Sequence, residues 1–444
     1  MTIDNALRAA TDTKALLVGD GAIGQVAKMF GDQFPGRKAI IVADDNTWRV
    51  AGLQVHALLQ RGGVQQDEPY IFHDQDLYAE WTFVERLKAV LQGTDAIPVA
   101  VGSGTINDLC KLTSHLTGRR YMSVGTAASM DGYTSYGASI TKDGAKQTFS
   151  CPAPQAWLGD TSIICQAPEQ MTAAGYADLF AKIVAGADWI LSDELGIEPI
   201  DANVWSIVQD SLPHALAHPQ AIHDRDPKAI GELVEGLILS GFTMQAHRSS
   251  RPASGADHQF SHLWNMEHHT NHGQHVSHGF QVSIGTLCSC ALYECALSTD
   301  LTKIDVDRCV AAWPTAQALK EEALHMFQGT DFPTIGAVET ASKYVDAQGL
   351  RQQLEQLAAC WPHLKERLQH QLIPFDEMKQ RLSLVGAPTE PGQIGVSRDY
   401  LRRSYVRAQY IRRRFTILDL AVRTGNMQPW LNRLFGHGGR WEAK

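Results

Sequence analysis

The first third of the chain alternates short apolar runs with helical patterns, and this alternation limits the folds that the sequence allows. The apolar runs, which we predict to be buried strands, span residues 15–18, 38–43, 96–101 and 120–124, and the predicted helices lie near residues 47–61, 78–92 and 105–117. Strands that alternate with helices predict parallel βαβ units. In such sheets, ligands bind at the carboxyl ends of the strands.

A glycine-rich turn follows the third predicted strand. Gly102, Ser103 and Gly104 stand between that strand and the next predicted helix, whose first turn includes Asp108. Glycine lets the backbone approach a ligand closely, and the free N–H groups of a helix N-terminus favour a phosphate. The turn is therefore a candidate pyrophosphate site with Asp108 beside it, and an ordinary strand-to-helix turn is the alternative.

A second glycine pattern competes with the first for the same cofactor. Residues 19–24 read Gly-Asp-Gly-Ala-Ile-Gly after a predicted strand, and Asp44 stands about 20 residues further on, as in the dinucleotide fingerprint. In that fingerprint an acidic residue holds a ribose hydroxyl. We expect Asp44 and Thr47 near an adenosine ribose in either arrangement; a simple turn or helix cap at these residues is the alternative.

Small residues and hydroxyl groups dominate between residues 125 and 139. Such a segment packs closely against a flat ligand and offers it hydrogen bonds. We therefore assign Thr126 and Ser129 to the cofactor site. An ordinary surface turn contains the same residue types and is the alternative.

The character of the sequence changes near residue 168. Beyond it the chain shows long helical patterns, and residues 231–242 are apolar on nearly every helical face, which is typical of a core helix. A chain of 444 residues exceeds the size at which one core stops growing. We predict a nucleotide-binding α/β domain over residues 1–167 and an all-α domain over residues 168–444.

Charge and composition argue against several classes of partner. The formal net charge of -9 disfavours nucleic acid or an anionic membrane. The eight cysteines form no paired C-x-x-C pattern, the N-terminal segment has no signal-like region, and no apolar run approaches the roughly 20 residues that span a bilayer. We expect a reduced cytoplasmic enzyme that acts on a small molecule and forms a homo-oligomer.

Six arginines between residues 402 and 414 predict a solvated or subunit-contact face, with an anion site as the alternative.

Histidines are concentrated in one region of the chain. Eight of the 18 histidines lie between residues 247 and 278. Imidazole suits zinc, nickel and ferrous iron, and a catalytic site needs three protein ligands so that one position stays open for substrate. Asp178 offers a carboxylate on a predicted helix beside small residues, where burial is costly unless the charge is paired. Each histidine alone fits a surface or core position, but the cluster predicts a metal.

Five segments together resemble a known family. They are residues 102–108, 126–132, 175–178 with Lys182, 250–258, and 278–279. Motifs of this length in this order are similar to those of the sn-glycerol-1-phosphate dehydrogenases, within the iron-containing alcohol dehydrogenase and dehydroquinate synthase-like superfamily. The resemblance extends from about residue 16 to residue 435. It implies a nucleotide-binding α/β domain, an all-helical C-terminal domain and a metal in the cleft between them.

The resemblance also implies the ligands of the metal. Asp178 and His258 match the family's aspartate and first histidine. Both His272 and His278 match the pattern of the second histidine, and we choose His278 because it opens the long apolar segment 280–297.

The resemblance favours the turn at residues 102–104 over residues 19–24 as the pyrophosphate loop. It matches Asp131 to a substrate-contacting aspartate, which would orient the substrate or pass a proton; a turn aspartate before glycine is the alternative. The chain departs from the family in a histidine-rich insert at residues 268–275 and in a longer C-terminal part. Both departures bear on the identity of the substrate.

The activity that the resemblance implies is reversible reduction of dihydroxyacetone phosphate to sn-glycerol 1-phosphate with NADH or NADPH. One divalent metal per chain, zinc before nickel or iron, would polarise the substrate carbonyl. Asp44 would repel a 2′-phosphate, which favours NAD. Arg248 and Arg251 precede the first metal histidine and are candidates for binding the substrate phosphate, with structural pairing as the alternative.

Three other functions remain as alternatives. A dehydrogenase for glycerol or another polyol without phosphate would use the same parts. A lyase of the dehydroquinate synthase type would need clustered basic residues that we do not find in the sequence. A non-enzymatic, histidine-rich metal-binding or storage module predicts several bound ions, with residues 268–275 dominant, and no nicotinamide binding.

Overall fold

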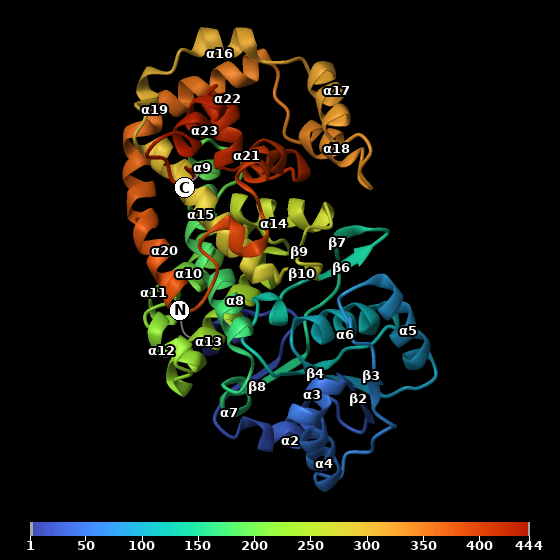
Figure 1. Cartoon of the computed structure of the whole chain (residues 1–444). Helices are drawn as coiled ribbons and strands as arrows, with labels where there is room; N and C mark the ends of the chain where they lie inside the picture. Colours follow the sequence, from blue (N-terminus) through green and yellow to red (C-terminus); the bar gives the residue numbers. More distant parts are fainter. Residues whose placement is uncertain (1–2, 443–444) are drawn as a thin grey trace. The chain divides into compact units, whose positions relative to one another are not determined.

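A computed structural model describes residues 3–442, and its largest sheet has six strands (Figure 1). The strands are β1 (Ala15–Gly19), β2 (Ala39–Asp44), β3 (Tyr70–Phe72), β4 (Ile97–Gly102), β5 (Met122–Gly125) and β8 (Ala156–Asp160). Their order across the sheet is β1-β8-β5-β4-β2-β3, and every pairing is parallel. The predicted parallel α/β fold is confirmed, and β3 and β8 are strands that the sequence analysis did not identify.

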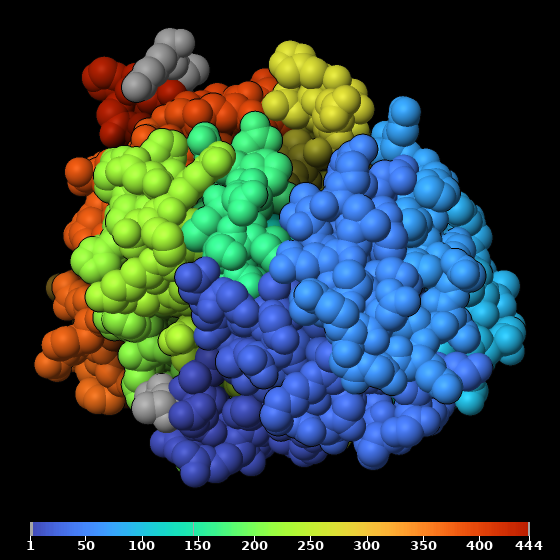
Figure 2. All heavy atoms as spheres, turned by 90° about the horizontal axis from the view of Figure 1, so that it is seen from below, coloured from blue at the N-terminus to red at the C-terminus, as the bar shows by residue number. Residues whose placement is uncertain are grey.

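Helices cover both faces of this sheet. Helices α2 (Val26–Gln33) and α4 (Leu53–Arg61) pack on one face, and helices α5 (Trp81–Gln92) and α6 (Gly104–Leu116) pack on the other. Within β2, Ile41 belongs to the first hydrophobic core and Ile40 to the second, as expected from the period of two along a strand. Burial on both faces explains the continuous apolar runs of β2 and β4. In the space-filling view, the residues coloured blue lie together and form a continuous area of the face that is seen (Figure 2).

The helix predicted near residues 47–61 is interrupted. The short helix α3 (Asp45–Thr47) leads into a π-helical turn, η2 (Trp48–Gly52), before α4 begins. A Cβ atom at Gly52 would meet the Trp48 ring at 2.5 Å, so the ring packs directly on the glycine backbone. The other two predicted helices correspond to α5 and α6.

An antiparallel hairpin that the sequence analysis did not identify follows β5. Strand β6 (Ala138–Lys142) pairs with β7 (Ala145–Phe149), and the segment between β5 and β6 contains the short helix η3 (Gly132–Thr134). Gly137, just before β6, has a φ of 85°, which is a conformation that favours glycine. The hairpin therefore fixes the end of the segment that carries Asp131.

The chain divides into two compact units, which we describe separately. The first comprises Met1–Leu179, Asn203–Ser250 and Leu384–Gly386, and the second comprises Phe180–Ala202, Arg251–Ser383 and Ala387–Lys444, of which the structure describes residues 3–442. The change from strands to helices falls between β8 and α8, close to residue 168. Domains over residues 1–167 and 168–444 remain a prediction, and the four terminal residues lie outside the described part.

The first unit carries its own helices beside the sheet. They are α1 (Ile3–Ala9), α7 (Thr161–Ile164), most of α8 (Glu169–Phe180), α10 (Ala202–Gln209), α11 (Leu212–Ala215), α12 (Pro219–His223) and α13 (Pro227–His247). Helix α13 begins at Pro227 after the N-cap Asp226, whose side chain accepts a hydrogen bond from the Ala229 N–H at 2.9 Å. Its residues from Leu233 to Gln245 are almost all buried, which confirms the predicted core helix.

The second unit is built of helices. They include α9 (Lys182–Glu194), α14 (Ala256–Met266), α15 (His278–Leu297), α16 (Val306–Ala312), α17 (Ala316–Met326), α18 (Ile335–Ala341), α19 (Ala347–Gln371), α20 (Phe375–Leu384), α21 (Arg398–Arg407), α22 (Ile417–Arg423) and α23 (Met427–Phe435). The histidine-rich insert forms a small hairpin of β9 (Thr270–Asn271) and β10 (Gln274–His275) between α14 and α15. Helices α14 and α15 touch at backbone distance, because a Cβ atom at Gly285 would lie 2.2 Å from the Asp257 carbonyl oxygen.

One helix in the described part of the chain is long and apolar enough to span a membrane. Helix α15 has 20 residues and a mean hydropathy of 1.3 over its most apolar window. The expectation that no run approaches this length was therefore wrong. Because 83% of that window is buried inside the protein, α15 is a core helix of the second unit.

The contact between α14 and α15 gives a test of the fold. We expect Gly285→Ala to lower the free energy of unfolding by about 1–3 kcal/mol, because the added methyl group would overlap a backbone carbonyl. The matched control is Gly31→Ala in α2, where no atom lies within 4 Å of the new Cβ and stability should stay equal or rise by about 0.5–1 kcal/mol. Urea unfolding followed by circular dichroism measures both, and equal stability of the two variants would contradict the close contact.

Candidate metal centre and nucleotide loops

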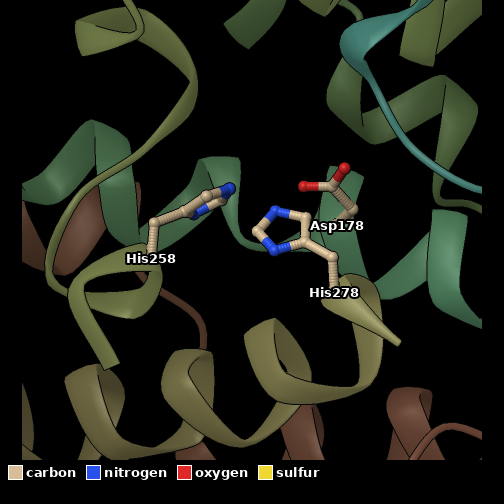
Figure 3. A group of neighbouring side chains, drawn as sticks. All are labelled: Asp178, His258 and His278. Carbon is tan, nitrogen blue, oxygen red and sulfur yellow. The ribbon is translucent and has the colours of Figure 1, made fainter. Parts of the chain in front are cut away.

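Asp178, His258 and His278 bring one carboxylate and two imidazoles together (Figure 3). One potential ligand atom from each residue lies within 4.8 Å of the others. Among residues 3–442, no other group of three or more His, Cys, Asp or Glu side chains has such spacing. The three residues predicted as ligands thus lie together, whereas His272 is exposed in the turn of the β9–β10 hairpin and stands outside the group.

Neighbouring side chains fix the orientation of both imidazole rings. The Nδ1 atom of His258 is hydrogen-bonded to the Asp257 carboxylate. Ser261 donates its hydroxyl proton to Gln281 Oε1 at 2.8 Å, so it accepts at 3.0 Å from Nδ1–H of His278. Both rings therefore keep Nε2 as the atom with a lone pair. Carboxylate and hydroxyl partners of this kind orient metal-binding histidines and raise their basicity.

The sequence analysis did not identify Asp257 and Ser261 as partners of the ligands. Asp257 stands directly before His258, and Ser261 lies three residues after it on the same helix. Ser261 follows His258 by three residues and Asp257 by four, and both spacings place side chains on one side of a helix, which is a signal that was available in the sequence.

Asp178 is tied to the segment that carries Asp131. The Asp131 N–H donates to Asp178 Oδ2 at 3.0 Å, and the Asp131 carboxylate accepts from the Ser240 hydroxyl at 2.8 Å. One turn earlier in α8, a Cβ atom at Gly175 would lie 2.0 Å from the Ala128 carbonyl oxygen. Helix α8 and residues 126–131 are therefore in direct backbone contact, which only glycine at position 175 permits.

A buried lysine that the sequence analysis did not identify binds the segment that follows Asp131. Lys111 in α6 is 1% exposed, and its Nζ donates to the carbonyl oxygens of Gly132, Ser135 and Gly137 at 2.7, 3.0 and 3.1 Å. These carbonyls replace water around the ammonium group. Lys111 therefore fixes the conformation of the chain after Asp131. Nothing in the local sequence distinguishes it from an ordinary lysine on a helix.

Asp108, which we predicted beside the pyrophosphate, is engaged inside the first unit. Its Oδ2 accepts from the Ser139 N–H at 3.2 Å, and Oδ1 lies 3.6 Å from Lys111 Nζ. Burial raises the pKa of the Asp108 carboxyl above its usual value, and the charge of Lys111 opposes that change. These contacts connect α6 to β6, and they give no support to a direct contact with the cofactor.

The later glycine turn has the geometry of an anion site. Ser103 is the N-cap of α6 and makes no side-chain capping bond, so the first amides of the helix have no side-chain acceptor there. Gly102 ends β4 beside Gly125, and the Thr126 N–H donates to the Gly102 carbonyl at 3.2 Å. The turn at residues 102–104 and Thr126 therefore share one edge of the sheet.

In the glycine pattern at residues 19–24, a side chain of the protein itself takes the place of a bound anion. The Ile23 N–H donates to Asp160 Oδ2 at 2.9 Å, and Gly19 pairs with Asp160 across β1 and β8. A carboxylate thus lies where a phosphate would bind. This arrangement favours residues 102–104 over residues 19–24 as the pyrophosphate loop.

Asp44 and Thr47 form a helix cap. Asp44 Oδ1 accepts from the N–H groups of Asn46 and Thr47 at 2.8 Å each, and the Asp44 N–H donates to Thr47 Oγ1 at 3.1 Å. Within residues 3–442 the other carboxylate oxygen, Oδ2, has no hydrogen-bond donor. Because β2 lies next to β4, this oxygen stands at the same edge of the sheet as Gly102. The helix cap at Asp44 and Thr47, which we named as the alternative, is present. It uses Oδ1 of Asp44 and leaves Oδ2 for a ribose hydroxyl.

Ser129 takes part in a local hydrogen-bond chain. Its Oγ lies 2.9 Å from the Tyr133 hydroxyl, which in turn donates to the Ala127 carbonyl. Ser129 therefore acts as the donor to Tyr133. Its assigned role in cofactor binding remains a prediction.

The two arginines predicted to bind phosphate lie in different environments. Arg248 is exposed at the end of α13 with a φ of 52°, and its guanidinium lies 5.3 Å from the centre of the Tyr136 ring. Arg251 is 2% exposed, donates to the Asp188 carbonyl at 2.8 Å, and has its Nε 3.1 Å from Glu198 Oε2. These contacts favour the structural role for Arg251.

The histidine-rich insert does not assemble a second ligand group. His268 Nε2 lies 2.7 Å from Asp331 Oδ2, and His269 Nε2 lies 2.6 Å from the Ile394 carbonyl oxygen. His272 is exposed at the tip of the hairpin. Because these side chains face different partners, the insert gives no support to a storage module.

Comparison with known proteins identifies similar sequences. Residues 17–168 match the family model described as iron-containing alcohol dehydrogenase. The chain is 36% identical over 258 residues to a glycerol-1-phosphate dehydrogenase of Halalkalibacterium halodurans, covering 57% of this chain and 64% of the relative. It is 30% identical to a glycerol-1-phosphate dehydrogenase of Methanosphaera stadtmanae, covering 56% of this chain and 70% of that relative. The names of both relatives specify NAD(P)+. The match thus spans somewhat less than two thirds of the Halalkalibacterium protein.

Solved structures share the fold over nearly the whole chain. The NADH-dependent butanol dehydrogenase A of Thermotoga maritima superposes with a TM-score of 0.59 and 14% identity, covering 95% of this chain and 97% of that protein. At this identity the likeness concerns the fold. It confirms the predicted arrangement of an α/β N-terminal part followed by a helical C-terminal part.

The contacts of the two imidazole rings generate a test of metal binding. We expect His258→Ala to abolish stoichiometric binding of zinc, and Asp257→Asn to weaken it by about 10- to 100-fold, because the asparagine no longer supports the ring as a carboxylate does. Competition with a chelator, together with metal analysis, measures both effects. His272→Ala is the matched control and should keep about one ion per chain; loss of the ion in that variant would contradict the assignment of His278.

The two glycine turns generate a second test. We expect Gly104→Ala to raise the Kd for NADH about tenfold or more, about 1.4 kcal/mol, because the methyl group narrows the turn at α6. Gly24→Ala should bind NADH as the unmodified protein does, since nothing lies within 4 Å of its new Cβ and no positive φ is lost. Fluorescence titration with NADH compares the variants, and the opposite ranking would restore residues 19–24 as the phosphate loop.

Proposed function

The chain belongs to the iron-containing alcohol dehydrogenase family, and from this premise we propose that it is a metal-dependent, NAD(P)-linked dehydrogenase that interconverts dihydroxyacetone phosphate and sn-glycerol 1-phosphate. The observation that carries the proposal is the grouping of Asp178, His258 and His278. Three protein ligands leave a position for substrate at a divalent ion. The names of the two relatives support the choice of substrate.

The residues present fit a divalent metal ion. With bonds of about 2.0–2.2 Å, two ligand atoms of a tetrahedral ion lie about 3.3–3.6 Å apart. Because the three ligand atoms lie within 4.8 Å of one another, each pair must approach by at most about 1.5 Å to surround an ion. One carboxylate and two neutral imidazoles suit zinc, with nickel and iron as alternatives. When bound, such an ion supplies Lewis-acid polarisation of a carbonyl.

The sheet edge formed by β2, β4 and β5 fits a nicotinamide dinucleotide. Gly102, Ser103, Gly104 and Thr126 would hold the pyrophosphate, because the first amides of α6 lack a side-chain cap. The Oδ2 atom of Asp44 would accept from a ribose hydroxyl and disfavour a 2′-phosphate, so we propose NAD before NADP.

The protein's own residues orient the substrate. Reduction adds a hydride to the carbonyl carbon and a proton to the carbonyl oxygen. Asp131 is 8% exposed and is held by Asp178 at its N–H and by Ser240 at its carboxylate. We assign it to a substrate hydroxyl, which it would orient or from which it would pass a proton. Lys111 keeps the following residues in place through three carbonyls.

Two further expectations belong to the same proposal. A homo-oligomer in a cytoplasmic setting is consistent with the family's dehydrogenase chemistry on a small phosphorylated ketone. Oxidation of a polyol without phosphate is the competing activity, and the experiment below separates the two.

The test is oxidation of NADH and NADPH by the metal-reconstituted protein with two ketones. We expect turnover with dihydroxyacetone phosphate and a kcat/KM for dihydroxyacetone that is lower by about 100-fold or more, because the smaller ketone forfeits the phosphate contacts. We also expect NADH to be preferred. A preference for the unphosphorylated ketone would establish the polyol reaction, and no turnover of either ketone by the metal-loaded protein would refute the proposed substrate.

A further inference from the structure

The basic segment near the C-terminus separates into paired and unpaired arginines. Arg407 pairs with Glu267 at 2.7 Å, and Arg413 donates from its backbone N–H to Glu339 at 2.7 Å and contacts the same carboxylate through its guanidinium. Arg402 donates to the Leu431 carbonyl at 3.0 Å. These arginines have structural partners inside the second unit, so the segment is not simply a solvated face.

Arg412 differs from its neighbours. Its side chain is half-buried, and it forms no hydrogen bond or ion pair with any residue between 3 and 442. Burial lowers the pKa of Arg412, with the charge of Arg413 acting in the same direction and Glu339 opposing it. A guanidinium that is withdrawn from water without a hydrogen-bonded partner is costly, and the cost is recovered when an anion binds.

Arg414 lies beside the start of α14, the helix that carries His258. Its guanidinium donates to the carbonyl and the hydroxyl oxygen of Ser254, and the Gln259 side-chain amide donates to the Arg414 carbonyl at 3.4 Å. Ser254 precedes His258 by one helical turn and Gln259 follows it. Arg414 is therefore held against the residues that surround the first metal histidine.

Several positive charges are crowded at this place. Burial and the nearby charges of Arg251 and Arg412 together lower the pKa of Arg414 to about 9, while the charges of Glu198 and Asp257 oppose that change. Arg251 is already used by the Asp188 carbonyl and Glu198. Within residues 3–442, Arg412 is the arginine of this group that has no hydrogen bond or ion pair, and its charge acts on the neighbouring Arg414.

We propose that Arg412 and Arg414 form the binding site for the phosphate group of the substrate. This inference rests on the proposed function. It assigns the binding of the substrate phosphate to Arg412 and Arg414 in place of Arg248 and Arg251, which the sequence analysis named. A guanidinium binds phosphate with two parallel N–H donors, which Lys or a neutral side chain does not reproduce. A phosphate bound here relieves the repulsion within the segment and places the rest of the substrate beside the turn of α14 that carries His258.

Binding of inorganic phosphate to the metal-loaded protein tests the site without turnover. We expect Arg412→Gln and Arg414→Gln to weaken phosphate binding by about 10- to 100-fold in calorimetric titrations. Arg413→Gln is the matched control, since Arg413 is exposed and pairs with Glu339, and it should bind phosphate as the unmodified protein does. Equal binding by all three variants would overturn the site, including the case in which phosphate is held by the metal alone.

The thermal midpoint separates this role from a structural one. Because Arg412 has no partner in the described part of the chain, Arg412→Gln should melt at or above the temperature of the unmodified protein without phosphate. It should also lose the stabilisation that added phosphate gives. A lower midpoint without phosphate, together with full stabilisation by it, would assign Arg412 to a structural or subunit contact.

Kinetics distinguish failure of the site from failure of the proposed function. We expect Arg412→Gln to raise the KM for dihydroxyacetone phosphate by about 10-fold or more and to leave the KM for dihydroxyacetone unchanged. If dihydroxyacetone phosphate is turned over and its KM does not change, the site is wrong and the function stands. If the two arginines bind phosphate but dihydroxyacetone phosphate is not turned over, the site stands for another phosphorylated substrate and the function is wrong.

Discussion

The second unit depends on the buried carboxylate of Asp188. Its two oxygens accept from the N–H of Ala256 at 2.7 Å, from the N–H of Ile417 at 2.8 Å and from the Tyr293 hydroxyl at 2.7 Å. These donors begin α14, begin α22 and lie on α15, so one side chain of α9 joins the starts of two helices to a third. Burial raises the pKa of Asp188 to about 6, and the three donors oppose that change. The helix that carries His258 therefore starts from a point fixed by hydrogen bonds.

In the first unit, Lys111 has the corresponding role with the opposite charge. It binds three carbonyl oxygens of the segment after Asp131, while Asp178 accepts the Asp131 N–H. A buried charge surrounded by backbone groups is stable only in one arrangement of that backbone, because each lost partner costs about 1–3 kcal/mol or more. In each unit, a buried charged side chain thus fixes the segment that carries a functional residue. Each of these charged side chains is distant in sequence from the groups that it binds.

The parts of the fold that could be predicted are those with a local signal. Strands β2 and β4 are buried on both faces and appear as apolar runs, whereas β3 has three residues and β8 contains Gly159 and ends at Asp160, which weakens the strand pattern. The metal ligands, which lie together in the structure, were predicted from the resemblance of the segments that contain them to a known family. The roles of Lys111 and Asp188 had no local signal, since their partners lie about 20 to more than 200 residues away. The same reason explains why Arg251, which looks available in the sequence, proves to be engaged in the structure.

Backbone contact at Gly175 has a consequence for motion. Because the α8 backbone touches the Ala128 carbonyl and Asp178 accepts the Asp131 N–H, helix α8 and residues 126–131 form one rigid block. Any hinge movement that opened this edge of the sheet would therefore have to lie outside these residues. A dinucleotide that orders residues 126–131 then also orders Asp178. If a cofactor bound there raised the affinity for a metal ion at Asp178, thermodynamic linkage would require the ion to raise the affinity for the cofactor by the same factor.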